Sequence, residues 1–361
     1  GWIVAQLAAQ DGINVRVYDV ASSPRKGDAA KAESLAAAQE NIHLCAIEEL
    51  AEESAAVIVD ALLGIGFRAP LSDVFKRAIT IINELSAKYA WVVSVDCPSG
   101  LDLQSGQTEL AVSADLVVTF IGDKVGHYLQ QGPMHCHEIV TENLQAVDLS
   151  EQHQAYFLDP AALALISPCK RQLNSHKGTY GHVTVIGGDY GYGGAAIMAS
   201  EAAAKSGAGT VSVYTQARHL TASLVRNPNV MALASEDAQI EDTLRSLDSV
   251  MVIGPGLGKS NWSKSLWSQC AQLPHSKVVD ADGLYWLKQK PIAGQTLVLT
   301  PHPGEAAALL GKTVTDILHD LPKAARSIAN QYRAIVILKS ATSIVASPEG
   351  QMVIVGKPCP G

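Results

Sequence analysis

The sequence is poor in cysteine pairs, basic charge and long apolar runs, and each shortage excludes a class of protein. Six cysteines in 361 residues, with no Cys-x-x-Cys pair, do not make a disulfide scaffold, so we expect reduced thiols in a cytoplasmic protein. No apolar run approaches the ~18 residues of a membrane helix, and no signal peptide is visible at the start. Lys and Arg number 27 against 35 Asp and Glu, and the net charge of −8 argues against a dedicated nucleic-acid binder.

What the sequence does contain predicts an α/β protein. Short runs rich in Val and Ile alternate with Ala-rich stretches of helical length, a pattern typical of a mainly parallel sheet with helices on both faces. The expected strands are residues 14–18, 56–59, 91–95 and 116–120 in the first half, and 182–186, 210–214, 249–253, 277–279, 296–299 and 334–338 in the second. The expected helices include residues 31–39, 73–88 and 195–206.

The length predicts two domains, at about 150 residues per domain. Residues 149–177 are the expected seam, because this stretch interrupts the alternation of strands and helices. A short helix is expected there at 160–166, followed by Pro168 and the polar residues Lys170, Arg171 and Asn174. We therefore place the first domain at 1–150 and the second at 159–361.

Acidic and hydroxyl side chains follow two expected strands of the first half, at the sheet edge where doubly wound folds bind ligands. Asp60 follows one strand, and Gly64 and Gly66 come soon after, where free backbone amides can face a polar ligand. The next strand ends in Asp96-Cys97-Pro98-Ser99. Either acid alone is better explained as capping a turn. Together, two carboxylates and a hydroxyl favour a site for a cation or for proton transfer.

Five expected strands of the second half end in Gly, Asp, His or Lys, and as a set they predict a nucleotide site. The Gly-rich stretch 187–194 leads into a helix, as an anion cradle does, but it lacks the Gly-Lys-Ser/Thr of a Walker A loop. The other strand ends carry residues 254–258, 280–283, 300–305 and 339–343. Taken singly, His302 suits a helix start as well as a ligand contact, and Lys339 is more typical of a solvated charge.

Together these residues closely resemble the bifunctional NAD(P)H-hydrate repair enzymes, in which a Rossmann-like epimerase domain precedes a ribokinase-like dehydratase domain. The likeness rests on residues 59–66 and 95–100 in the first half, and on His176-Lys177-Gly178 and residues 187–194, 254–258, 280–283 and 300–305 in the second. The resemblance implies an α/β fold with an N-terminal Rossmann-like three-layer domain and a ribokinase-like α/β domain after it.

The family epimerises the R and S hydrates of NADH and NADPH at C6 of the nicotinamide ring. It then dehydrates the S form to NAD(P)H at the expense of ADP, or of ATP in eukaryotic relatives. The resemblance therefore implies small-molecule hydrates as substrates, a nucleotide with Mg²⁺, and K⁺ in the epimerase domain. We also expect a homo-oligomer, and no nucleic-acid or membrane partner.

The resemblance also assigns residues to these ligands. It implies K⁺ at Asp60 and Ser99, and gives Asp96 the roles of substrate contact and acid or base of the epimerase. Implied substrate contacts are Gly64, Ile65, Gly66, Phe67, Arg68, Ala69, Pro70 and Asp96 in the first half, and Ala195, Gly256 and His302 in the second. Implied contacts to the nucleotide phosphates are Lys339, Ser340, Ala341, Thr342 and Ser343.

The chain departs from the family pattern in three places. Family members carry an Asn-Asn-Gly-Gly-Asp loop before the first helix, and a Gly-Gly-Met-Gly-Asp segment whose Asp is the dehydratase base. Neither is in this sequence, so we expect both domains to be truncated, the base to lie beyond Gly361, and dehydration by this chain to be weak or absent. Ser340 and Thr342 stand where the family has glycines, at a close backbone approach that bears on nucleotide affinity.

Two other functions remain open on the sequence. A ribokinase-like small-molecule kinase fused to a Rossmann-like domain would share the motifs of the second half, although the epimerase-like first half favours repair. A non-catalytic scaffold is the other alternative for the first half, and the presence of Asp60, Asp96 and Ser99 argues against it.

Overall fold

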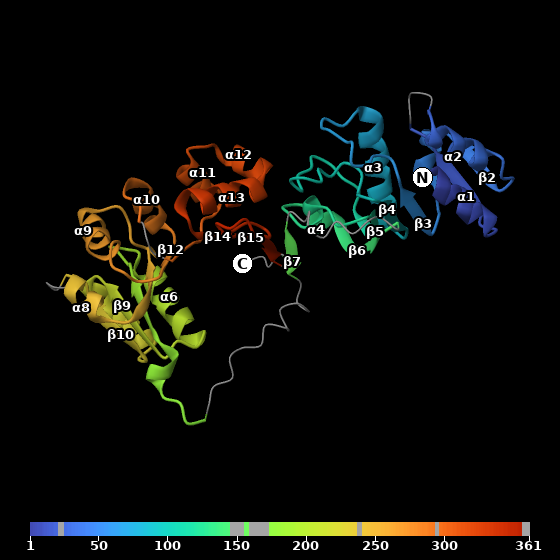
Figure 1. Ribbon diagram of the computed structural model, residues 1–361. Coiled ribbons are helices and arrows are strands. Elements are labelled where there is room, and N and C mark those ends of the chain that lie inside the picture. The colour runs from blue at the N-terminus through green and yellow to red at the C-terminus, as the bar shows by residue number, and fades with distance from the viewer. Residues whose placement is uncertain (21–24, 145–154, 159–172, 237–239, 293–295, 356–361) are drawn as a thin grey trace. The chain divides into compact units, whose positions relative to one another are not determined.

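The computed structural model describes residues 1–20, 25–144, 155–158, 173–236, 240–292 and 296–355. These residues divide into two compact units, one within 1–152 and the other within 153–356, whose chain paths are drawn in Figure 1. Among the described helices, none combines the length and the apolar composition needed to cross a membrane.

The first unit is built from short strands that alternate with helices. Its helices are α1 (Trp2–Gln10), α2 (Asp28–Ala37), α3 (Asp73–Ser86) and α4 (Gly132–His135), with 3₁₀ turns η1 (Ile47–Glu52) and η2 (Val125–His127). Its strands are β1 (Val15–Tyr18), β2 (Ile42–Cys45), β3 (Val57–Asp60), β4 (Trp91–Val95), β5 (Ala114–Phe120) and β6 (Cys136–Glu142). Strands β3-β4-β5-β6 form a parallel sheet in sequence order, and β1 and β2 form a separate parallel pair.

Helix α3 shows why this layering forms. Its buried residues Ile79, Ile82 and Leu85 recur at helical spacing and join one apolar core with Val92 of β4 and Val117 of β5. Helix α3 contacts β4 along this face (Figure 1). This packing buries Val92 and Val117, and the carboxyl ends of the parallel strands lie at one edge of the sheet, with Asp60 and the residues after β4.

The second unit is one ten-stranded sheet flanked by helices. Its strand order is β10-β9-β8-β11-β12-β13-β14-β15-β16-β7. The strands are β7 (Tyr156–Leu158), β8 (His182–Ile186), β9 (Thr210–Thr215), β10 (Val230–Ala234), β11 (Ser249–Ile253), β12 (Lys277–Val279), β13 (Leu297–Leu299), β14 (Ile335–Leu338), β15 (Ser343–Ala346) and β16 (Met352–Val355). The pairs β14–β15 and β15–β16 are antiparallel, and the other pairs are parallel.

The helices of the second unit cover this sheet. They are α6 (Gly193–Lys205), α7 (Leu220–Arg226), α8 (Ile240–Ser246), α9 (Asn261–Cys270), α10 (Asp282–Gln289), α11 (Pro303–Leu310), α12 (Val314–His319) and α13 (Leu321–Tyr332), with 3₁₀ turns η4 (Lys177–Tyr180) and η5 (Ala217–His219). Helix α6 packs on β8 and β9 around Val185, Ala196 and Val213. Helices α11, α12 and α13 gather near β14 and β15 (Figure 1).

The expectation of a largely parallel α/β fold is confirmed, with additions. The sequence pattern did not predict β2, β6, β7, β10, β15 and β16. Strand β7 lies inside the expected seam, and the helix expected at 160–166 lies outside the described residues. Of the cysteines in the described ranges, Cys45, Cys97, Cys136 and Cys270 are free thiols.

Candidate active sites

Asp60 ends β3 as a buried carboxylate whose two oxygens both accept hydrogen bonds. Its Oδ2 accepts from Ser94 Oγ and from the Ser99 amide, each at 2.8 Å. Its Oδ1 accepts from Ser99 Oγ at 2.5 Å and from the Leu62 amide at 3.3 Å. Burial nevertheless raises the pKa of Asp60, because these neutral donors do not replace water fully. Asp60 therefore joins the ends of β3 and β4 through Ser99.

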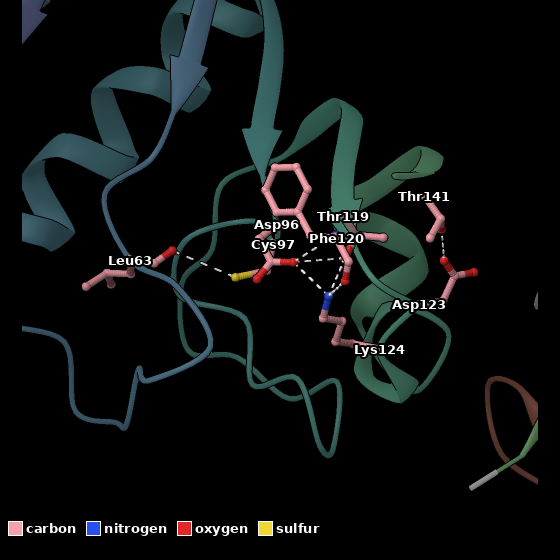
Figure 2. Close-up of polar contacts among 8 residues, drawn as sticks. All are labelled: Leu63, Asp96, Cys97, Thr119, Phe120, Asp123, Lys124 and Thr141. Atoms are coloured by element: carbon pink, nitrogen blue, oxygen red, sulfur yellow. Dashed lines mark hydrogen bonds and ion pairs between the residues drawn. The ribbon is translucent and has the colours of Figure 1, made fainter. Parts of the chain in front are cut away.

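Asp96 follows β4 and forms a partly buried ion pair with Lys124, in a polar cluster with Thr119 and Phe120 (Figure 2). Its Oδ1 accepts from Lys124 Nζ at 2.7 Å, from Thr119 Oγ1 at 3.0 Å and from the Phe120 amide at 3.2 Å. Burial would raise the pKa of Asp96, but these hydrogen bonds outweigh burial and hold the pKa below its ordinary value. Asp96 is thus a carboxylate at neutral pH, and its side-chain hydrogen bonds from described residues go to Oδ1.

The backbone of Asp96 is unusual as well. Its φ of 69° lies in the left-handed region that non-glycine residues rarely adopt. The neighbouring Cys97 thiol donates to the Leu63 carbonyl at 3.8 Å (Figure 2). Burial, reinforced by the charges of Asp96 and Asp60, raises the pKa of Cys97 to about 12. The Cys97 thiol therefore stays protonated at neutral pH, whereas the Asp96 carboxyl beside it is ionised.

The loop after Asp60 is exposed and carries two glycines that the fold does not require. At Gly64 and Gly66 a Cβ atom would meet nothing within 4 Å, and neither residue has a positive φ. Gly100 is different, because it has φ +95° and a Cβ there would lie 2.2 Å from the Leu110 carbonyl oxygen. Gly100 is thus a structural glycine, whereas Gly64 and Gly66 suit the close approach of a ligand.

In the second unit, the Gly-rich loop after β8 packs tightly against the loop after β11. The Gly188 amide donates to the Pro255 carbonyl at 3.1 Å, and the Asp189 amide to the Gly256 carbonyl at 2.7 Å. A Cβ at Gly187 would lie 2.1 Å from the Pro255 carbonyl oxygen. The glycines at these positions are therefore needed for packing between the two loops. Fewer residues of the stretch 187–194 are left to face an anion than the sequence predicted.

The exposed part of that loop lies at the start of α6. Ala195 is exposed there, and Gly194 has open space where a Cβ would stand. The Ala195 amide donates to the Tyr192 carbonyl at 3.3 Å, so an anion here would face the amides that precede it in this first turn. Asp189, just before, is buried and accepts from Gln216 Nε2 at 2.5 Å and from Ser263 Oγ at 3.2 Å. Through these two hydrogen bonds Asp189 holds the Gly-rich loop after β8 in place.

The ends of β12, β13 and β14 meet in one charged cluster. Asp280 Oδ1 accepts from Lys339 Nζ at 2.8 Å and from Thr300 Oγ1 at 2.7 Å. Burial would raise the pKa of Asp280, but Lys339 and Thr300 hold the pKa below its ordinary value. The Gly258 amide donates to Asp282 Oδ2 at 3.0 Å, which joins the β11 loop to this cluster.

His302 caps the helix that follows β13. Its Nδ1 accepts from the Gly304 amide at 3.0 Å and from the Glu305 amide at 3.4 Å, while the Glu305 side chain accepts from the His302 amide at 2.9 Å. This reciprocal arrangement is a capping box around α11. The Nδ1 atom is therefore engaged in capping the helix, while more than half of the His302 side chain is exposed.

The comparisons with known proteins agree in both halves. A family model described as YjeF-related protein N-terminus matches residues 1–126, and one described as NAD(P)H-hydrate dehydratase matches residues 183–359. The bifunctional NAD(P)H-hydrate repair enzyme Nnr of Coxiella burnetii is 38% identical over 354 residues, covering 96% of this chain and 71% of that protein. This chain belongs to the bifunctional NAD(P)H-hydrate repair enzyme family.

Another member of the repair enzyme family, Nnr of Escherichia coli, is 34% identical over 362 residues, covering 96% of this chain and 67% of that protein. Among solved structures, a ribokinase-like superfamily protein from Enterococcus faecalis is similar with a TM-score of 0.50 and 24% identity. That likeness covers 60% of this chain and 75% of the other. It supports the ribokinase-like fold of the second unit.

In this member of the repair enzyme family, most of the residues that the sequence singled out follow the carboxyl ends of parallel strands, in one sheet of each unit. The ends of β8, β11, β12, β13 and β14 are neighbours in the sheet order. Sequence reasoning missed Lys124, the direct partner of Asp96. A signal for it was present, because Gly122-Asp123-Lys124 also follows an expected strand and that strand end was not considered. It also missed that Asp189 is held by two partners distant in sequence.

Proposed function

We propose that this chain epimerises the R and S hydrates of NAD(P)H in its first unit and acts in its second unit on the S hydrate with ADP. The assignment of these activities to residues 1–150 and 159–361, and of the site residues to each, is part of the proposal. One observation carries it: Asp96 is held ionised, with Lys124 and two further donors on Oδ1 and no described hydrogen-bond partner on Oδ2.

In the epimerase site, Asp96 would act at the hydroxyl-bearing carbon of the damaged ring. A general base has to lie within hydrogen-bond reach of the proton that it removes and be ionised at working pH. Asp96 meets the second condition, and the lysine at 2.7 Å sets its orientation. Residues Gly64 to Pro70 would lie against the substrate, since Gly64 and Gly66 are free of packing constraints.

Potassium at Asp60 and Ser99 belongs to the same proposal. The residues fit a monovalent cation in one respect: Asp60 is a buried carboxylate whose hydrogen-bond partners among the described residues are all neutral donors. A buried carboxylate without a counter-charge is costly, and a bound cation would supply one. The oxygens that would hold K⁺ are those of Asp60 and Ser99, and the ion would fix the loop that follows β3. In the described ranges, no group of three or more His, Cys, Asp or Glu side chains is placed to bind a metal.

In the second unit, Ala195, Gly256 and His302 are the proposed substrate contacts. Residues Lys339 to Ser343 would hold the nucleotide phosphates. Phosphoryl chemistry depends mostly on position and charge stabilisation, and phosphorylation turns the substrate hydroxyl into a leaving group. Mg²⁺ would arrive with the nucleotide and neutralise phosphate charge, with Asp280 as the carboxylate beside Lys339.

Three finer points accompany this proposal. The chain acts on small molecules, it is located in the cytoplasm, and it forms a homo-oligomer. The acidic net charge of −8 supports the first of these, because it opposes a polyanionic partner.

The test separates the two units. Purified R hydrate of NADH is incubated with the chain without nucleotide, and conversion to the S form is followed by chromatography. Asp96→Asn should slow conversion by about 10²–10⁴-fold, the usual contribution of an acid or base group, while Glu84→Gln on the exposed side of α3 is the matched control.

The second unit is tested by calorimetric titration with ADP and Mg²⁺, comparing the parent chain with Lys339→Met. Weaker binding by the variant is expected. Phosphorylation of a small alcohol such as a hydroxymethylpyrimidine, with no conversion of either hydrate, would instead identify a ribokinase-like kinase and refute the proposal.

A further inference from the structure

Arg218 and Tyr190 form an exposed stacked pair beside the Gly-rich loop of the second unit. The Arg218 guanidinium carbon lies 4.5 Å from the centre of the Tyr190 ring, and Tyr190 is 70% exposed. Arg218 belongs to the turn η5 after β9, and Tyr190 belongs to the loop after β8. An exposed stack of this kind contributes little to stability, so we ask what ligand the pair could bind.

The turn that carries Arg218 is fixed to the Gly-rich loop by its neighbours. His219 Nε2 lies 3.2 Å from the Asp189 carbonyl oxygen, and Gln216 Nε2 donates to Asp189 Oδ1 at 2.5 Å. A Cβ at Gly193 would lie 2.5 Å from the His219 ring, so the turn packs directly on the start of α6. The backbone on both sides of Arg218 is thereby held in place, which lowers the ordering cost when a ligand binds.

The donors of Arg218 are not taken up by an acidic group. None of the ion pairs between described residues includes Arg218. Both side-chain oxygens of Glu236 accept from the Ala217 amide at 3.2 Å, and Asp189 accepts from Gln216. The carboxylates that contact the neighbours of Arg218 are therefore engaged with other donors. A guanidinium without an acidic partner is suited to bind an anion from solution.

The pair lies next to the proposed substrate contacts Ala195 and Gly256. A Cβ at Gly256 would lie 2.3 Å from the Tyr192 carbonyl oxygen and 3.2 Å from the Ala195 Cβ, so these three residues are neighbours. Tyr190 comes two residues before Tyr192, and two residues of chain span at most about 7 Å. Because β9 is the neighbour of β8 on the side away from β11, Arg218 borders these contacts on the β9 side.

A nicotinamide dinucleotide hydrate needs a cation beside the residues that contact its ring. Its phosphates are several bonds away from the nicotinamide, so a phosphate subsite is expected next to the ring contacts and not among them. Arginine suits this task, because its planar fork can donate two parallel hydrogen bonds to a phosphate while one face stacks on an aromatic ring. In dinucleotide-binding folds, an arginine can accommodate the 2′-phosphate of NADP.

We propose that Arg218, held on the Tyr190 ring, binds a phosphate of the NAD(P)H hydrate in the second unit. This inference rests on the proposed function, because it adds a subsite to the same substrate site. The phosphate is either the pyrophosphate that both hydrates share or the 2′-phosphate that only the NADPH hydrate carries. Arg218 is the phosphate contact, and Tyr190 is a positioning residue that orients the guanidinium.

The test has to report on the second unit alone, because under the proposed function the first unit also binds hydrates. The S hydrate of NADPH or of NADH is titrated into the full chain, and hydrogen exchange in residues 187–195 is followed by mass spectrometry. Arg218→Met removes the charge and keeps an unbranched side chain. It should raise the concentration for half-maximal protection by about tenfold or more. Arg245→Met is the matched control, because Arg245 is exposed and lies in α8, just before the amino end of β11 at the opposite edge of the sheet.

The two hydrates distinguish the two phosphates. A loss of affinity confined to the NADPH hydrate would assign Arg218 to the 2′-phosphate, and an equal loss for both hydrates would assign it to the pyrophosphate. Either result supports the proposal. Unchanged affinity for both hydrates in Arg218→Met, or the same loss in Arg245→Met, would overturn it.

Variants of Tyr190 test the positioning role separately. Tyr190→Leu should weaken hydrate binding about two- to fivefold, whereas Tyr190→Phe keeps the ring and should bind as the parent does. Equal affinities of these two variants would overturn the role of Tyr190. A parent chain in which neither hydrate protects residues 187–195 would refute the proposed function of the second unit, and this subsite with it.

Discussion

Replacing Lys124 by glutamine tests whether the lysine holds Asp96 ionised. The two side chains are about one-fifth exposed, 22% and 21%, and the Nζ–Oδ1 distance is 2.7 Å. Hydrogen bonds to charged groups contribute about 1.5–3 kcal/mol when sheltered, and exposed ion pairs at most about 1 kcal/mol. Partial exposure places this pair near the lower end, so Lys124→Gln should lower the free energy of unfolding by about 1–2 kcal/mol at pH 7.

The sign of the pH dependence follows from the pKa of Asp96. A carboxyl whose folded pKa lies below its unfolded value contributes stability above the unfolded pKa, and that contribution is lost as pH falls through the folded pKa. Burial would raise the pKa of Asp96 and the lysine lowers it, so the variant should have a higher pKa. The stability difference between parent and variant should therefore be largest at neutral pH and shrink in acid.

The measurement is urea unfolding at neutral and acid pH, followed by amide exchange at the strands of the first unit. Lys76→Gln is the matched control, because its partner Glu109 is 68% exposed and the pair should contribute under about 0.5 kcal/mol. An equal loss of stability at both pH values, or none at pH 7, would refute the role given to Lys124.

Four further predictions concern single positions. Ser99→Ala removes a hydroxyl that donates to buried Asp60, and should cost about 1–3 kcal/mol in urea unfolding; a loss below 0.5 kcal/mol, taken as about the noise of surface changes, would show that another donor takes its place. Gly100→Ala should destabilise the chain by more than about 1 kcal/mol because its Cβ has no space. Gly64→Ala should leave the midpoint of urea unfolding unchanged and weaken binding of the hydrate. Unchanged hydrate binding would exclude the loop after Asp60 from the substrate site. His302→Asn should keep the helix cap, whereas His302→Ala should cost about 0.5–2 kcal/mol; a weaker affinity for the S hydrate in both variants would separate ligand contact from capping.

The sequence pattern predicted the interior strands best, because strands with neighbours on both sides are mostly apolar and rich in Val and Ile. β4, β8 and β11 are such strands, and their predicted bounds agree with the structure. Strand β6, Cys-His-Glu-Ile-Val-Thr-Glu, was missed because most of its residues are exposed and its polar residues hide the strand signal. Strand β7 has only three residues and pairs with β16, which is distant in sequence. A local sequence pattern cannot predict such a pairing.

The sequence predicted the acidic residues at the strand ends of the candidate site, but not the lysines that pair with them. Parallel sheets gather their carboxyl ends at one edge, so Asp60, Asp96 and Asp280 could be located from local sequence. Which cation faces which acid depends on side-chain reach and loop path. Lys124 is 28 residues from Asp96, and Lys339 is 59 residues from Asp280. Such distances in sequence carry no pairing signal in a single chain.

If Lys339 binds a nucleotide phosphate as proposed, its ion pair with Asp280 has a consequence for affinity. The Asp280 carboxylate lies 2.8 Å from the Lys339 ammonium, so a phosphate would have to compete with it for that ammonium. The affinity for a nucleotide would therefore depend on how much more strongly Lys339 binds a phosphate than it binds the Asp280 carboxylate. A ligand that brings its own divalent cation has an advantage, because the displaced carboxylate then receives a new counter-charge. Free phosphate and the magnesium complex of a nucleotide should differ in affinity for this reason alone.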